Sequence, residues 1–312
     1  MKTIGAFLRL TRWPNLVFIG LTQALFYFSL FHSLLNQQSY PHGHRLFLLL
    51  VVASILIAAA GYIINDYFDL QIDAVNKPEK VVVDKEVKRR WAIMWHLVFS
   101  AVGILLSIFI SYKTGSWVIT IANICCVILL WFYSTTFKKR LLSGNIIIAA
   151  LTAWVIIVMY FFSGADHKVW FADDHLYDAR KLFKFTILYA GFAFIVSLVR
   201  EALKDLEDIE GDARYHCRTM PIVWGVPAAK VFIAVWLIVC ISSLAIVQLY
   251  AWKSGWRLIV GYNIITIIFP LCWILQKLYT AVSKEDYHTL SSAVKFVMLA
   301  GILSMAFFRF LN

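Results

Sequence analysis

Long apolar runs, separated by short polar segments, make up most of the chain. A helix needs about 20 predominantly apolar residues to cross the hydrocarbon core of a bilayer, and the runs reach or approach that length. They lie at residues 16–35, 46–64, 92–112, 117–133, 145–162, 184–200, 230–252, 257–275 and 293–311. The pattern predicts an all-α, polytopic membrane protein with about nine transmembrane helices.

The first apolar run raises the question of a signal peptide, because it follows Arg9 and Arg12. It is about twenty residues long and lacks a small-residue cleavage site, so we expect a retained helix. Pro14 would stand in its first turn, where a missing N–H does no harm. Arg12 is expected to anchor the chain at the membrane interface, with a contact to substrate as the alternative.

Composition supports a membrane protein. Of the 312 residues, 61% are hydrophobic and only 15% are charged, and the mean hydropathy is +0.76. Ordinary soluble domains do not approach these values. The five cysteines have neither zinc-site nor redox spacing, so we expect them to serve packing. They are Cys125, Cys126, Cys217, Cys240 and Cys272.

The net charge of +11 could indicate a nucleic-acid partner, but its distribution argues against one. If the N-terminus is inside, Lys and Arg concentrate at that terminus and in the loops after the second, fourth, sixth and eighth helices. This is the positive-inside rule. It predicts an integral, multi-pass protein of the inner or cell membrane, with a cytoplasmic N-terminus. The outward segment 163–181 has acids and histidines at irregular spacing, which favours a solvated loop over a metal site.

Two acidic motifs follow the second and sixth predicted helices. Asn65 begins the first and Lys204 begins the second, and three aspartates follow each at the same spacing. These are Asp66, Asp69 and Asp73, then Asp205, Asp208 and Asp212. At about 100° per residue, each set occupies one face of a helix. Solvated charges at helix ends are the alternative, but the repeated spacing favours a shared ligand.

Clustered carboxylates repel one another unless a cation lies between them. Oxygen-only ligands favour a hard cation such as Mg²⁺, which shares its shell with water and substrate phosphates. The second and sixth helices are four spans apart and therefore share an orientation. A parallel internal repeat would turn both acidic faces toward one central cavity, where two Mg²⁺ ions could bracket one diphosphate.

Basic residues on the same predicted face are candidates for binding phosphate. Lys138 and Lys139 follow Tyr133 at the end of the fourth helix, and either lysine could neutralise a diphosphate. Lys77 and Lys80 lie in the loop after the first motif, where contact with lipid headgroups is the alternative.

The residues of these motifs resemble the UbiA superfamily of intramembrane prenyltransferases. The resemblance covers about residues 10–225. It rests on Asn65-Asp66-x-x-Asp69-x-x-x-Asp73, Tyr133-Ser134 before a basic run, Gly144-Asn145 and Asp208-x-x-x-Asp212. It implies a nine-helix, all-α fold with a central cavity open to the membrane, and a single transmembrane prenyltransferase domain over residues 1–312. It also implies Mg²⁺-dependent transfer of an isoprenoid from its diphosphate to a lipophilic or aromatic acceptor.

The resemblance also implies roles for individual residues. One Mg²⁺ would be held by Asn65, Asp66, Asp69 and Asp73, and the other by Asp208 and Asp212 with Asp205 nearby. The residues closest to the chemistry would be Asp69, Asp73, Asp208 and Asp212. Lys138 or Lys139 would hold the diphosphate, with Tyr133 and Lys77 close by. The chain departs from the family pattern at Lys80, where the family usually has Arg.

Within the superfamily, the stretch from Arg200 to Asp212 most resembles the branch of digeranylgeranylglyceryl phosphate synthase. That branch prenylates a glycerol-phosphate ether lipid, so geranylgeranylglyceryl phosphate is the expected acceptor. Arg200 and Lys204 would bind its phosphate, although Lys204 could instead pair with Asp208 at i+4. Enzymes acting on homogentisate share part of the motif, which leaves an aromatic acceptor such as 4-hydroxybenzoate as the alternative. Lys295, in the last helix, is expected to extend to the inner surface.

Aromatic residues near the first motif and the fourth helix are expected to line the cavity and stabilise an allylic cation. They are Tyr67, Phe68, Trp131 and Tyr133. No Ser-His or Cys-His arrangement indicates a covalent intermediate. A secondary transporter is the alternative from another class, but transporters carry their charges near the midplane, in broken helices. A purely structural membrane protein is the other alternative.

Overall fold

The computed structural model describes residues 2–31, 33, 42–78, 81–164 and 176–310. Apart from one isolated bridge between Val83 and Val87, the regular structure of this part is helical. Nine of its helices are long and apolar enough to cross a membrane. The predictions of an all-α fold and of about nine spans are therefore confirmed.

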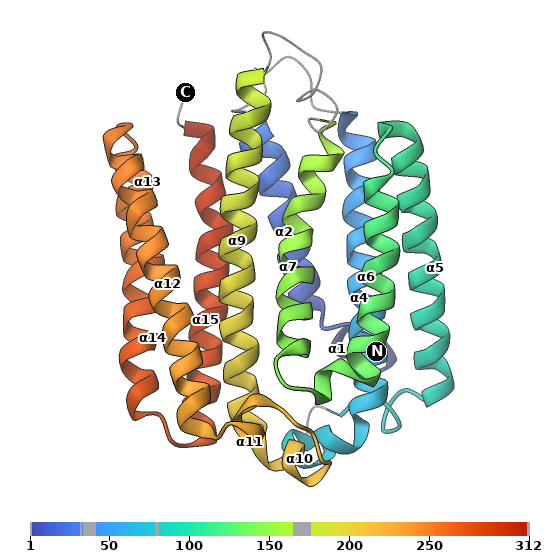
Figure 1. Cartoon of the computed structure of the whole chain (residues 1–312). Coiled ribbons are helices and arrows are strands. Elements are labelled where there is room, and N and C mark those ends of the chain that lie inside the picture. Colours follow the sequence, from blue (N-terminus) through green and yellow to red (C-terminus); the bar gives the residue numbers. More distant parts are fainter. Residues whose placement is uncertain (1, 32, 34–41, 79–80, 165–175, 311–312) are drawn as a thin grey trace.

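The spans alternate in direction along the chain (Figure 1). In chain order they are α2 (Trp13–Leu25) with η1 (Phe26–Phe31), α4 (Gly43–Asn76), α5 (Arg89–Thr114), α6 (Val118–Thr135), α7 (Ser143–Phe162), α9 (Leu176–Glu207), α12 (Val226–Lys253), α13 (Arg257–Asn263) with η4 (Ile264–Ile268) and α14 (Phe269–Thr280), and α15 (Lys284–Ser304) with η5 (Met305–Phe310). Both η1 and η4 are π-helical, and each continues the α-helix before it.

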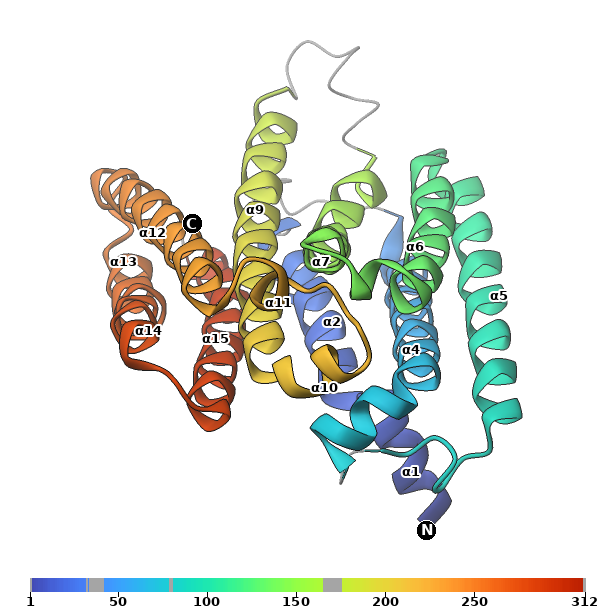
Figure 2. The ribbon, with the colours of Figure 1, turned by 60° about the horizontal axis from the view of Figure 1, so that its bottom comes forward.

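Helix α9 stands in the middle of the bundle (Figure 1). It packs against α7 on one side and against α12 and α15 on the other, while α4 packs against α5 and α6. Helix α2 contacts α4, α7 and α15 and so joins the two halves. The short helices α1 (Lys2–Leu10), α10 (Ile209–Arg214) and α11 (Met220–Val223) lie at the end of the bundle where α4 and α9 finish (Figures 1 and 2). Both acidic motifs therefore lie at the same end.

Apolar clusters hold α4 and α9 from several sides. One cluster includes Tyr27 of η1, whose ring stacks on Phe47 of α4 with 3.9 Å between centroids. Another packs Leu203 of α9 against Leu237 of α12 and Val294 of α15. Because these contacts bury α4 and α9 along their length, the ends that carry the acidic motifs have defined positions.

The two motifs differ in local structure. Helix α4 continues through the first motif to Asn76, whereas α9 ends at Glu207 and α10 begins at Ile209. Asp208, with φ −104° and ψ 11°, interrupts the helix, and its carbonyl accepts a hydrogen bond from Asn76. The second set of aspartates is therefore divided between two helices, with Asp205 in α9 and Asp212 in α10.

Pro14 lies in the first turn of α2, as predicted. The parallel repeat and the central cavity stay predictions. Lys80 and most of the segment 163–181, which was expected to be a solvated loop, lie outside the described residues.

Candidate active site

The first motif is only partly open to solvent. Asn65 and Asp69 are buried, with 7% and 1% of their surface exposed, and the Asp69 carboxylate pairs with the Lys138 ammonium. Asp66 accepts a hydrogen bond of 2.6 Å from Nη2 of Arg12. Asp73 is half-buried. The carboxylates thus lie in the C-terminal part of α4, where two of them already have cationic partners.

Lys138 lies on the short helix η3 (Phe137–Lys139). A methyl group on Gly144 would lie 3.0 Å from the Lys138 Cα, so only glycine lets the start of α7 approach this turn so closely. Burial acts to lower the pKa of Lys138, but the neighbouring carboxylates, Asp69 above all, raise it well beyond its usual range. The ammonium is therefore charged at neutral pH. Lys139 is exposed, so Lys138 is the lysine that faces the carboxylates.

The second motif is held by polar contacts from two other segments of the chain. Asp205 accepts a hydrogen bond of 2.8 Å from Nδ2 of Asn145 in α7. Nζ of Lys77 lies 2.9 Å from a carboxylate oxygen of Asp208 and 3.2 Å from Oε1 of Glu207. Burial raises the pKa of Asp212 to about 6. In this motif, Asp208 is therefore paired with a lysine and Asp205 accepts a hydrogen bond from an amide. Asp212 is the carboxylate whose pKa is raised.

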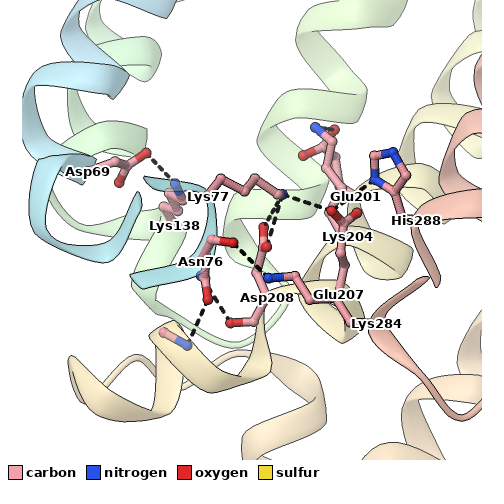
Figure 3. A network of polar contacts seen from close by, with 11 residues as sticks. Asp69, Asn76, Lys77, Lys138, Glu201, Lys204, Glu207, Asp208, Lys284 and His288 are labelled. Atoms are coloured by element: carbon pink, nitrogen blue, oxygen red, sulfur yellow. Dashed lines mark hydrogen bonds and ion pairs between the residues drawn. The ribbon is translucent and has the colours of Figure 1, made fainter. Parts of the chain in front are cut away.

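Asn76 connects the two motifs (Figure 3). Its side-chain oxygen accepts a hydrogen bond of 2.8 Å from the backbone N–H of Gly211, and its amide donates to the Asp208 carbonyl at 3.2 Å. The Asn76 carbonyl accepts a hydrogen bond of 2.7 Å from Nζ of Lys284, at the start of α15. The end of α4 is thereby tied to α10 and to the last span.

The predicted acceptor residues form a separate group one to two turns before Asp208. Lys204 donates to Oε1 of Glu201 at 2.7 Å, and Nη1 of Arg200 donates to the same oxygen at 3.1 Å. Because Lys204 pairs with Glu201, the alternative in which it pairs with Asp208 is wrong. Tyr133 lies near Lys138 and Glu201, as its electrostatic contacts with both show.

Several residues at the site did not stand out in the sequence. Arg12 was expected at the membrane interface, but it pairs with Asp66 and lies over the Tyr62 ring at 5.3 Å. It does so from a left-handed backbone conformation with φ 50°, which indicates a position set by tertiary contacts. Asn145, which donates to Asp205, and Glu201, which accepts from two basic residues of α9, are the other such residues. The Gly144-Asn145 pair was the available signal, but no spacing rule connects it to the second motif.

Three of the four predicted cavity aromatics lie elsewhere. Phe68 and Trp131 contact each other edge to face, with 5.8 Å between centroids, and remain 37% and 38% exposed. Such positions fit a lipid-facing surface better than the wall of a site. Tyr67 packs beside the cluster of α1 and Ile63, which leaves Tyr133 as the aromatic residue of the four that lies beside the carboxylates.

The donor set fits Mg²⁺ bound together with phosphate better than a metal held by protein alone. In the described part of the chain, no three Asp, Glu, His or Cys side chains converge on a metal position. Mg²⁺ needs only one or two carboxylates beside waters and substrate phosphates. The side-chain oxygen of Asn65 is buried and accepts no hydrogen bond from the described residues, and the remaining donors are carboxylates. These oxygens are the ligands that Mg²⁺ prefers.

An apolar cavity of about 70 Å³ lies away from these residues. Its lining comes from the ends of α9, α12 and α15 opposite the acidic motifs, and from α13 and η4; it includes Tyr189, Gln248 and Ser304. None of the candidate site residues lines it. The chemistry is therefore assigned to the polar end of the bundle.

Comparison with known proteins identifies the family. The UbiA prenyltransferase family model matches residues 13–310. This chain belongs to the UbiA prenyltransferase family. It is accordingly a prenyltransferase and an integral, multi-pass membrane protein, as the resemblance implied, and not a transporter.

Similar proteins include digeranylgeranylglyceryl phosphate synthases from several organisms. The one from Methanosphaera stadtmanae is 30% identical over 280 residues, covering 85% of this chain and 89% of that protein. The one from Methanoregula boonei is 30% identical over 255 residues, with 82% and 80% covered.

Solved structures of UbiA homologues share the fold. The Archaeoglobus fulgidus homologue bound to DMAPP and Mg²⁺ has a TM-score of 0.59 at 18% identity, covering 96% of this chain and 99% of that one. The apo homologue from Aeropyrum pernix K1 has a TM-score of 0.63 at 16% identity, covering 97% and 98%.

Proposed function

We propose that this UbiA-family enzyme transfers a geranylgeranyl group from its diphosphate to geranylgeranylglyceryl phosphate, with Mg²⁺ as cofactor. The observation that carries the proposal is that Lys138 faces carboxylates of both motifs. Its ammonium pairs with Asp69 and interacts electrostatically with Asp73 of the first motif and Asp212 of the second. Two acidic motifs arranged around one charged lysine suit a ligand that brings both cations and phosphate oxygens.

The metal-binding residues in this proposal are those of the two motifs. They are Asn65, Asp66, Asp69, Asp73, Asp205, Asp208 and Asp212. Bound Mg²⁺ would neutralise the charge that develops on the departing diphosphate. Lys138 and Lys77 would exchange a carboxylate partner for a phosphate oxygen and add to that neutralisation. Asn76 would keep the motifs at a constant separation through its contacts with Gly211 and Asp208.

The acceptor proposal draws on the digeranylgeranylglyceryl phosphate synthases among the similar proteins and on the charges beside the second motif. An acceptor phosphate needs cations beyond those that hold the diphosphate, and Arg200 and Lys204 lie one to two turns from Asp208 on α9. An aromatic acceptor such as homogentisate or 4-hydroxybenzoate would not need both.

We further propose that the chain forms a single transmembrane domain over residues 1–312 whose N-terminus and acidic motifs face the cytoplasm. Short basic loops on the side of α10 and the 77–90 segment support this orientation. The family match over residues 13–310 supports a single domain.

The experiment that tests the function is a transfer assay with purified protein and radiolabelled geranylgeranyl diphosphate. The acceptors are geranylgeranylglyceryl phosphate, homogentisate and 4-hydroxybenzoate, each with Mg²⁺ and with EDTA. We expect labelled product with the glycerol-phosphate lipid in preference, and none with EDTA. A better yield with an aromatic acceptor would contradict the acceptor proposal, and transfer undiminished by EDTA would contradict the proposed cofactor.

A further inference from the structure

Lys295 turns into the bundle instead of toward the end of its helix. Its ammonium lies 5.4 Å from the centroid of the Phe18 ring in α2, and its charge interacts with that of Arg200 in α9. The prediction that Lys295 extends to the inner surface is therefore wrong. Two cations from different helices share a half-buried position in the membrane-spanning part of the protein.

The register of α9 against α15 explains why Lys295 and Arg200 lie close together. Near the acidic motifs, Nδ1 of His288 lies 3.0 Å from Oε1 of Glu207. The two helices are antiparallel (Figure 1), so seven residues back from Glu207 and seven forward from His288 lead to Arg200 and Lys295. Seven residues are about two turns, which places this pair on the same faces and about 10 Å deeper.

Cations outnumber carboxylates around this pair. Glu201 accepts hydrogen bonds from two of the cations, and Asp66 pairs with a third. Arg12 also interacts electrostatically with Glu201 and Lys204, so the group is continuous. We call its basic members the deep cation cluster: Arg12, Arg200, Lys204 and Lys295.

The deep cation cluster therefore carries about two positive charges beyond those that Glu201 and Asp66 neutralise. One of its donors is also unused, because Nε of Arg200 is buried and has no hydrogen-bond partner among the described residues. Unneutralised charge and an unpaired donor inside a membrane are both unfavourable. An anion with several acceptor oxygens would relieve both.

We propose that the deep cation cluster binds the phosphate of the acceptor lipid, and that Lys295 is a specificity-determining residue for that phosphate. A phosphate monoester carries a charge of about −1.5 to −2 at pH 7, which matches the excess. A phenol carries no charge and an aromatic carboxylate only one. The attacking hydroxyl of a glycerol-phosphate ether is on the carbon next to the phosphate ester, so holding the phosphate also positions the hydroxyl. This inference rests on the proposed function and names the group that the site recognises.

The test measures binding and turnover separately. Purified wild type, Lys295→Met, Lys295→Arg and Lys277→Met are titrated with geranylgeranylglyceryl phosphate and with its dephosphorylated form, geranylgeranylglycerol, without prenyl diphosphate. Lys277 is the matched control, because it is an exposed lysine on the neighbouring helix α14. KM values for both substrates are then measured in the transfer assay.

We expect Lys295→Met to weaken binding of the phosphate-bearing lipid by at least about tenfold, the effect of losing one charge-assisted hydrogen bond. Binding of geranylgeranylglycerol should stay within about twofold of wild type, and so should the KM for geranylgeranyl diphosphate. Lys295→Arg should restore most of the affinity, and Lys277→Met should behave as wild type.

Two results would overturn the inference. One is equal affinity of wild type and Lys295→Met for the phosphate-bearing lipid, and the other is an equal loss for both lipids, which would indicate a structural role. Either result can occur while the enzyme still transfers geranylgeranyl to geranylgeranylglyceryl phosphate. If the wild type prefers an aromatic acceptor and also binds both lipids equally, the proposed acceptor and this inference fail together.

Discussion

The side-chain oxygen of Asn76 accepts a hydrogen bond of 2.8 Å from the backbone N–H of Gly211. The two residues belong to different acidic motifs and are 135 positions apart, so this contact sets the relation between the ends of α4 and α10. Both residues are buried. A buried amide that satisfies a backbone donor and a backbone acceptor is costly to replace, because each group would be left unpaired.

The first prediction concerns this contact. A methyl group on Gly211 would lie 2.4 Å from the Asn76 side-chain oxygen and 2.5 Å from its nitrogen and carbon. We therefore expect Gly211→Ala to push the motifs apart, with a stability loss of about 1–3 kcal/mol and a larger fall in kcat. Apparent melting temperature and single-turnover rate measure the two effects.

The double variant separates steric conflict from hydrogen bonding. Asn76→Ala alone should destabilise by leaving the Gly211 N–H unpaired, and Asn76→Ala with Gly211→Ala should be less damaging than the sum of the single changes. Strict additivity would mean that the two residues are not coupled. A Gly211→Ala enzyme with wild-type kcat would contradict a role for this contact in positioning the motifs.

Most of the fold could be predicted from the sequence, because membrane spans depend on local hydropathy. The apolar runs place every span, and Pro14 marks the start of α2. The long helix of Gly43–Asn76 was also foreseeable, since no helix breaker precedes Pro78. The interruption at Asp208 was not, because the contact made there comes from Asn76, which lies far away in the sequence.

The site could be predicted in its composition but not in its pairings. The spacing of Asp66, Asp69 and Asp73 identified the acidic cluster. Spacing alone could not distinguish Lys138 from Lys139, since that choice depends on how η3 meets Gly144. Nor could it assign Lys77 to Asp208 or turn Lys295 inward, because both arrangements come from packing between separate helices.

The second prediction concerns the ion pair of Asp69 and Lys138. Asp69→Asn should lower turnover by at least about two orders of magnitude, as expected for the loss of charge stabilisation at the leaving group. It should also destabilise the protein, because it leaves a charged Lys138 beside a neutral amide in a buried place. Transfer assays and apparent melting temperatures measure the two effects.

Adding Lys138→Met to Asp69→Asn distinguishes stability from catalysis. The double variant should regain part of the lost stability, since the ammonium left beside the new amide at position 69 is removed, while turnover stays as low as in the single variant or falls further. Recovery of turnover along with stability would show that the carboxylate acts through folding alone and would contradict a role at the leaving group.

The third prediction concerns orientation in the membrane. Cysteines replacing the exposed residues Lys88 and Arg214 should resist impermeant maleimides in intact cells and react after permeabilisation, because their basic loops are expected in the cytoplasm. Ser254→Cys, in the turn between α12 and α13, is the control and should react in intact cells. The native exposed cysteines, Cys125 and Cys272, are first replaced by alanine. Labelling of Lys88→Cys from outside would reverse the proposed topology.

The fourth prediction is a pH dependence of stability that involves Asp212. Burial, with a further contribution from the nearby Asp208, raises the pKa of Asp212 from 3.8 to about 6. Between these values the folded protein holds a proton that the unfolded chain has lost, so this group makes stability fall as pH rises from about 4 to 6. A shift of this size corresponds to at most about 3 kcal/mol above pH 6.

Asp212→Asn removes that penalty. In EDTA, the variant should melt at a higher temperature than wild type at pH 7.5, and the difference should disappear near pH 4, where the wild-type carboxyl is neutral in both states. Mg²⁺ with a prenyl diphosphate should reverse the order at pH 7.5, since ligands that bind only the folded state stabilise it and the amide carries no charge to bind the cation. Glu210→Gln, on the exposed side of α10, is the control and should melt as wild type does. If Asp212→Asn melts no higher than wild type at pH 7.5 in EDTA, the charged Asp212 carboxylate does not destabilise the metal-free protein, and this prediction is wrong.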